Sequence, residues 1–206
     1  MTGPGYSADD LGRALRDALV HVAADGWQQP PSLFALVSTA ALAQANPGLV
    51  DPDDDSALSP IAQDPLEVGA GDEPYGRLES FLATLSWPDG VAGAALVTEI
   101  LVLPPNAETD LDTAFEPLLA DPDAGAAAAR SVARSHPDAR TARLAVGALR
   151  DGPRLALMYL RPDDSTEGEA TAVPAELLTH PDMAPNLQEA LAATFDPDVD
   201  SPDSVD

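Results

Sequence analysis

One carboxylate interrupts the most apolar stretch of the sequence. Glu99 lies within ALVTEILVL, a run that otherwise has the composition of a buried β-strand. A carboxylate that loses its hydration without a partner costs free energy, so Glu99 is expected to meet an arginine, a hydroxyl or water. The candidate arginine partners are Arg143 and Arg161, which follow in a later segment. A position on an exposed edge strand and a role as catalytic acid are the alternatives.

The positive charge of the chain is concentrated in residues 130–161. The 206 residues carry 10 arginines, no lysine and 35 acids, a formal net charge of −25, yet this segment holds 7 arginines and 2 acids. The arginines either neutralise surrounding carboxylates or form a basic face that receives an acidic segment, from the protein's own tail or from a partner. The candidate binding residues are therefore Glu99, Arg143, Arg150, Arg154 and Arg161.

An acidic run resembles the opening of a calcium-binding loop. Asp51, Asp53 and Asp55 have the alternating spacing of such a loop. Ser56 stands where its turn requires glycine, however, and Ala62 stands where it requires a bidentate glutamate. A solvated acidic loop is the favoured interpretation, hard-cation binding is the alternative, and no metal ligands are assigned.

The three histidines do not form a catalytic or zinc-binding pattern. His136 and His180 each begin a His-Pro-Asp tripeptide, as in J-domain co-chaperones, but there the tripeptide follows a lysine-rich helix. Here each histidine is expected near a helix C-terminus, with proline as the stop and aspartate as the next N-cap. His21 is expected at a helix edge. The sequence also contains no glycine-rich phosphate loop, dinucleotide fingerprint or nucleophile elbow, and no cofactor is assigned.

Several segments have clear helix or strand patterns. Residues 8–24 are predicted to be a helix, because Leu11, Leu15, Ala18 and Val22 recur at helical spacing, Ser7 can cap the start and Gly26 can end it. Strands are predicted at 32–38 and 93–103. A short helix is predicted from Thr39, stopped by Asn46-Pro47-Gly48, and further helices at 76–87 and 186–195 and from Asp110 and Asp123.

The arginine-rich segment is predicted to be a β-hairpin over residues 141–161. Asp151-Gly152 is a two-residue hairpin signal. With those residues as the turn, Leu144 faces Tyr159 and Val146 faces Leu157, and the arginines lie towards the ends or rims. Small residues on the other side (Ala145, Gly147 and Ala156) would let a helix approach closely.

Together these elements predict one α+β domain over residues 1–195, with a mainly antiparallel sheet of about four strands packed with several helices. Residues 51–74 are expected to form a flexible acidic loop, and residues 196–206 a disordered acidic tail.

Composition excludes some classes of protein. Without cysteine the chain cannot form disulfides or thiolate metal sites. Its longest apolar run is too short for a membrane span, and its N-terminus lacks the pattern of a signal peptide, so a cytoplasmic location is expected. The charge of −25 disfavours nucleic acid and anionic lipid surfaces as partners and favours a protein with a basic or apolar surface.

Three segments carry a family resemblance: SLFALVSTAAL, LESFLATLSWPDGVAGAALVTEILVLPP and ARTARLAVGALRDG. They resemble an uncharacterised family of small acidic cytoplasmic proteins from high-GC Gram-positive bacteria, over most of residues 8–195. The resemblance implies a fold and no activity. The function expected is a non-enzymatic protein-binding, adaptor or chaperone-like module. The alternative is an enzyme with a carboxylate/arginine site, either with or without the assistance of a metal.

Overall fold

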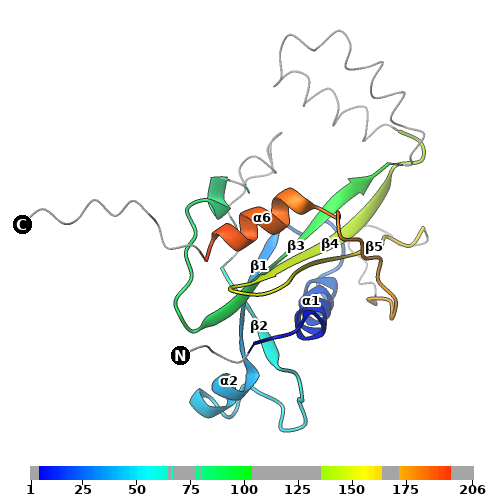
Figure 1. Cartoon of the computed structure of the whole chain (residues 1–206). Helices are drawn as coiled ribbons and strands as arrows, with labels where there is room; N and C mark the ends of the chain where they lie inside the picture. Colours follow the sequence, from blue (N-terminus) through cyan, green and yellow to red (C-terminus); the bar gives the residue numbers. More distant parts are fainter. Residues whose placement is uncertain are drawn as a thin grey trace, which may run out of the picture.

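A five-stranded antiparallel sheet forms the centre of the protein (Figure 1). The computed structural model describes residues 5–64, 66, 78, 80–103, 136–163 and 172–195. The strand order is β2-β1-β3-β4-β5. The strands are β1 (Ser32–Ser38), β2 (Leu58–Ala62), β3 (Val91–Val102), β4 (Arg140–Leu149) and β5 (Arg154–Leu160). The α+β class and the antiparallel sheet are confirmed, and the described residues form five strands, where about four were predicted.

Helix α1 (Ala8–Ala23) covers one face of the sheet. Ser7 and Asp10 form a capping box at its start, which satisfies backbone donors that the first turn leaves unpaired. The predicted stripe is buried, with Leu11 and Leu15 fully enclosed. Gly147 lets the helix approach β4, because a Cβ there would lie 2.8 Å from the Cδ2 atom of Leu15. The predicted close approach of a helix at Gly147 is therefore confirmed.

Helix α6 (Pro185–Ala193) lies on the opposite face of the sheet (Figure 1). Its Leu187 and Leu191 pack in a second core layer with Leu144 and Val146 of β4. The two layers explain why the central strands β1 and β3 are apolar on both sides. The strands predicted at 32–38 and 93–103 are therefore present.

The strand that the sequence analysis missed is β2, which lies inside the predicted flexible loop 51–74. Its register pairs Leu36 with Pro60, and Leu58 is buried in the α1-side core. Pro60 obscured the pattern, because proline cannot donate to a ladder and is tolerated only where its nitrogen faces away from the neighbouring strand. The short helix predicted after β1 is α2 (Thr39–Ala45).

The hairpin is present, but its predicted register is wrong by one residue. Arg143 pairs with Tyr159 and Leu144 with Met158, so Leu144 and Tyr159 lie on opposite faces. A two-residue turn would need a hydrogen bond from the nitrogen of Pro153, which carries no hydrogen. The observed loop instead uses Leu149 N–H, which donates to Pro153 O at 3.1 Å, and Gly152 N–H, which donates to Leu149 O at 3.4 Å. As a result Ala156 lies on the α6 side of the sheet, away from Ala145 and Gly147.

Some predicted segments lie wholly or partly outside the described residues. These are the helices from Asp110 and Asp123, the tail 196–206, and most of the loop beyond residue 64. Of the predicted helix 76–87, residues 78 and 80–82 are helical, and Trp87 lies beyond them.

Candidate functional site

Glu99 and Arg143 form an ion pair across the two central strands. They are direct partners in the β3–β4 register, and Arg143 Nη2 lies 3.0 Å from Glu99 Oε1. Arg143 is fully buried, whereas the Glu99 side chain is 17% exposed. The expected partner of Glu99 is therefore found, but the predicted rim position of Arg143 is wrong: a guanidinium lies in the core.

The core accommodates Arg143 because other groups share its donors. Nη2 also donates to Gly26 O at 2.6 Å, and Nη1 donates to the Tyr159 hydroxyl at 3.1 Å. Its guanidinium lies 4.3 Å from the ring centre of Trp27, close enough for a cation–π interaction. Within the described residues, Arg143 Nε has no hydrogen-bond partner. Burial raises the pKa of Tyr159 against the opposing effect of Arg143, so the phenol stays neutral.

The loop after α1 supplies the remaining partners of Glu99. Gln28 N–H donates to both carboxylate oxygens, at 2.9 and 3.1 Å. Gly26 and Gln28 both have left-handed backbone conformations, with φ of 79° and 69°. These turns aim the peptide N–H groups at Glu99 and place Trp27, only 1% exposed, in the core. Glu99 is thus neutralised inside the fold, an arrangement that favours a structural role over that of a catalytic acid.

The other candidate arginines are dispersed. Arg161 lies 5.6 Å from the ring centre of Trp27, so it is near the Glu99–Arg143 pair. Arg150 donates to the backbone carbonyls of Trp87, Pro88 and Val91, which fixes the turn before β3. Arg154 is exposed at the start of β5. The five predicted residues therefore do not form one site.

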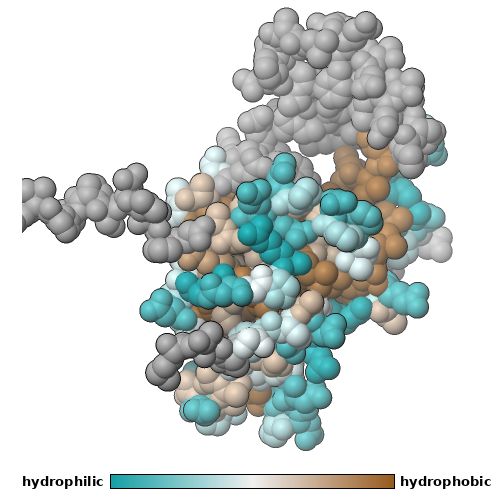
Figure 2. Space-filling view, in the orientation of Figure 1, coloured by the Kyte–Doolittle hydropathy of each residue, from teal (hydrophilic) through white to brown (hydrophobic). Residues whose placement is uncertain are grey.

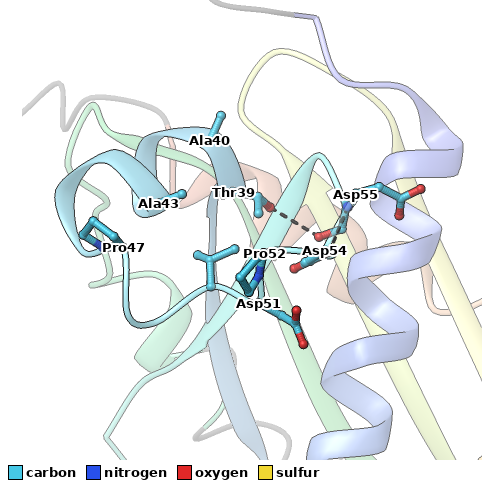
Figure 3. A pocket seen from close by; sticks show the side chains of 10 residues that line it. Thr39, Ala40, Ala43, Pro47, Asp51, Pro52, Asp54 and Asp55 are labelled. Atoms are coloured by element: carbon cyan, nitrogen blue, oxygen red, sulfur yellow. Dashed lines mark hydrogen bonds between the residues drawn. The ribbon is translucent and has the colours of Figure 1, made fainter.

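A pocket of about 380 Å³ lies at the other end of β1, between α2 and the loop before β2 (Figure 3). Its apolar residues lie on one side and its aspartates on the other (Figure 3). Hydrophobic and hydrophilic residues meet at this corner of the surface (Figure 2). Thr39 lies at its base and hydrogen-bonds to Ser56 and Ser59. The lining residues are Thr39, Ala40, Ala43, Pro47, Val50, Asp51, Pro52, Asp54, Asp55 and Ser56.

Local hydrogen bonds shape the acidic side of the pocket. Asp51 Oδ1 accepts from Asp53 N–H at 3.0 Å, and Asp54 Oδ1 accepts from Ser56 N–H at 2.9 Å. Asp55 points towards α1, where it pairs with Arg13 at 2.8 Å (Figure 3). These turns use carboxylate oxygens to order the loop, and they leave negative charge at the pocket.

Two carboxylates beside the pocket have shifted pKa values. Hydrogen bonds from Ser56 lower the pKa of Asp54, so it is charged at neutral pH. On α1, partial loss of hydration and then the charge of Asp54 raise the pKa of Asp17. Because the two carboxylates repel each other, a cation near them would stabilise both.

Neither the calcium-like spacing nor the histidines produce a metal site in the described part of the chain. No group of three or more His, Cys, Asp or Glu side chains there is arranged to hold a metal ion. His136 and His180 accept hydrogen bonds at Nδ1 from the backbone N–H of Asp138 and Asp182. The predicted N-cap roles are wrong, because β4 follows Asp138 and Ala184 is the N-cap of α6. His21 is exposed on α1 and meets Phe34 edge to face, as expected for a helix edge.

The pocket was not predicted as a site from the sequence. Aspartates at alternate positions are compatible with a solvated loop, and the apolar wall comes from α2, earlier in the chain. The signal that was available is the run of aspartates followed by Ser56, which is typical of side-chain-to-backbone turns. Such turns hold carboxylates in fixed positions.

Within the described residues, no helix is both long and apolar enough to cross a membrane. The fold and sites define a small acidic α+β domain, with a five-stranded antiparallel sheet between helices, a core ion pair and a surface pocket. The chain belongs to the PPA1309-like protein family, whose model matches residues 11–196. The expected resemblance to an uncharacterised family is thereby confirmed, and the family's description gives no activity. No curated protein and no solved structure matches the chain.

Proposed function

We propose that this protein is a non-enzymatic protein-binding module of the adaptor type. The pocket between α2 and the loop before β2 would receive a basic side chain of its partner. The observation that carries the proposal is the composition of this pocket, in which small apolar residues face aspartates. A lysine or arginine side chain has the matching chemistry, an apolar stem with a cationic end.

Electrostatics supports a cationic partner in two ways. The net charge of −25 attracts basic surfaces at long range and speeds their association. At the pocket, the repulsion between Asp17 and Asp54 would be relieved by a bound cation. Asp55 is already paired with Arg13, so Asp51 and Asp54 are the carboxylates proposed to meet the partner.

The alternative, an enzyme with a carboxylate/arginine site, has less support. It requires a concave site that holds Glu99 with an arginine or histidine. The Glu99–Arg143 pair is enclosed by Trp27 and the backbone of Gln28, and the pocket described here has other lining residues.

A peptide titration tests the proposal. The probe is acetyl-Gly-Ala-Ala-Lys-Ala-Ala-Gly-amide, and its control carries norleucine in place of lysine, which keeps the stem and removes the charge. We expect the lysine peptide alone to bind, and Asp51→Asn/Asp54→Asn to weaken binding about tenfold, since each exposed charge pair contributes up to about 1 kcal/mol. Asparagine keeps the acceptor oxygens that shape the loop.

The matched control is Asp89→Asn/Asp151→Asn, which removes two exposed charges in turns that do not line the pocket. Equal weakening by both double variants would show attraction to overall charge and would contradict a pocket. Equal binding of the norleucine peptide would also contradict it.

A further inference from the structure

The two edges of the sheet are protected in different ways. On the β2 edge, Thr39 N–H donates to Ala57 O and Gln63 N–H donates to Leu33 O. In an antiparallel pair, alternate residues of a strand hydrogen-bond to the neighbouring strand. Because residues 57 and 63 hydrogen-bond to β1, the backbone of Pro60 faces away from β1. A proline at an outward-facing position lacks the N–H that an added strand would need, so this edge pairs poorly with another strand.

The β5 edge is covered by the segment 172–180, called the strap below. Leu178 exchanges two backbone hydrogen bonds with Met158, at 2.9 and 2.8 Å. The Thr179 hydroxyl donates to Ala156 O at 2.9 Å. Among the described residues, Leu178 is the strap's one bridging partner for β5. The strap therefore uses the outward-facing backbone of β5 without forming a strand of its own.

Few buried groups hold the strap in place. Val173 and Leu177 are half-buried against the α1-side core, and Leu178 is 54% exposed. The main polar anchor is Arg16 on α1, which donates to the carbonyls of Pro174 and Ala175, each at 2.7 Å. A segment with little buried apolar area and largely exposed hydrogen bonds opens at low free-energy cost.

We propose that the β5 edge is a docking site for an extended segment of a partner protein, which displaces the strap and adds as an antiparallel strand. Strand addition draws its affinity from backbone hydrogen bonds, and Met158 and Ala156 supply outward-facing groups for them. The site is separate from the pocket, and this inference does not depend on a basic side chain binding there.

The strap itself indicates the chemistry of the segment that replaces it. Continuing the register of the Met158–Leu178 pair would set Asp182 opposite Arg154, and Glu176 one position from the residue opposite Arg161. Arg154 is exposed and makes no hydrogen bond or ion pair within the described residues. The matching partner is an extended segment with an apolar centre and a carboxylate at each end. A second copy of this chain fits poorly, because each copy carries a charge of −25.

Two variants loosen the strap without changing the sheet. Arg16→Gln removes the anchor to Pro174 and Ala175, and Leu178→Pro removes the N–H that donates to Met158 O. Exchange of the Met158 amide hydrogen with deuterium measures strap opening in the full chain. Leu157, whose partner in the register is Ala145 on β4, serves as the internal reference for an intact sheet.

The binding probe is acetyl-Glu-Val-Thr-Val-Thr-Val-Asp-amide, in about 0.3 M NaCl so that long-range repulsion is screened. We expect both variants to speed Met158 exchange while Leu157 stays protected, and to tighten peptide binding about tenfold relative to the unmodified chain. Arg154→Gln should weaken binding severalfold, and lysines at both peptide ends should abolish it.

The same peptide with N-methylated threonines keeps the side chains and, in the register of the Met158–Leu178 pair, loses backbone donors that face β5. If it binds as well as the parent peptide, strand addition is wrong. If Met158 exchange does not change in either variant, the strap is a fixed part of the sheet and the proposal fails. It also fails if exchange speeds up but no peptide binds.

Discussion

The guanidinium of Arg143 makes directed contacts inside a largely apolar core. It meets Glu99, Gly26 O, the Tyr159 hydroxyl and the face of Trp27. A buried charge is tolerated when a counter-charge and hydrogen bonds compensate most of its lost hydration, and it then fixes the geometry around it more than it stabilises the fold. Here it ties the left-handed loop after α1 to the centre of the sheet.

Removing the counter-charge should therefore be costly. Glu99→Ala leaves Arg143 buried without its carboxylate and should lower the free energy of unfolding by about 3 kcal/mol, the lower end for a broken buried pair because Glu99 is partly exposed. Urea denaturation measures this. The exposed control Arg154→Gln should change stability by less than about 0.5 kcal/mol.

The double variant Glu99→Ala/Arg143→Leu should recover part of the loss, because it removes the uncompensated charge. Strictly additive losses from the two single variants would show that the residues do not interact energetically and would contradict the assigned pair.

Because the pKa of Asp17 is raised, replacing this residue should stabilise the protein at neutral pH but not at low pH. Burial and Asp54 raise its pKa in the folded state, so the charged form is less favourable there than in the unfolded chain. The penalty is absent at pH well below the unfolded value and develops as the pH rises through the folded value. Asp17→Asn should therefore increase the free energy of unfolding at pH 7 by less than about 0.5 kcal/mol, seen as a higher melting temperature. At pH 3 it should not raise the melting temperature. A larger gain at pH 3 would contradict the direction of the shift.

At the scale of elements, the contact between α1 and β4 depends on Gly147, which has no side chain. A Cβ at position 147 would lie 2.8 Å from Leu15 and 2.9 Å from Leu11, both fully buried. Gly147→Ala should cost about 1–3 kcal/mol, as overpacking does, measured by urea denaturation. The control is Gly90→Ala, where nothing lies within 4 Å of the added carbon. Equal effects of the two substitutions would contradict close helix packing at Gly147.

The helices and central strands were predictable because their patterns are local. The stripe of α1, its Ser7 cap, and the strands β1 and β3 follow from residue spacing alone. The register of the hairpin was missed because Asp151-Gly152 is a strong turn signal, while Pro153, which lacks the required N–H, decided the loop. β2 was missed because Pro60 and the acids before it are typical of loops.

The sites were less predictable, since they join residues that are distant in sequence. Arginine is normally a surface residue, and the predicted hairpin put Arg143 towards an end or rim. Its burial depends on the loop carrying Trp27, 116 positions earlier in the chain, as the numbering shows. The pocket likewise needs α2 and the aspartates to be brought together by β1 and β2.

At the scale of the whole molecule, the two proposed binding surfaces lie at opposite edges of one sheet. The pocket adjoins β2 and the strap covers β5, which are the first and last strands in the order. Their charges are also opposite, with aspartates at the pocket and Arg154 at the β5 edge. Under the two proposals, two different proteins would bind at once, as an adaptor requires.

The charge of −25 should also make stability depend on salt. Repulsion between like charges destabilises a compact chain, and salt screens it over a Debye length of about 8 Å at 0.15 M. The melting temperature should therefore rise when NaCl is increased from about 0.01 to 0.3 M. A fall would show that attractive ion pairs such as Arg13–Asp55 outweigh the repulsion.

Binding at the pocket is most directly tested by nuclear magnetic resonance of the isotope-labelled chain during titration with the lysine peptide. The account predicts saturable shifts of the backbone amides of residues 39–56, absent with the norleucine peptide and in Asp51→Asn/Asp54→Asn. Shifts spread over acidic residues across the surface, or none in residues 39–56, would contradict it.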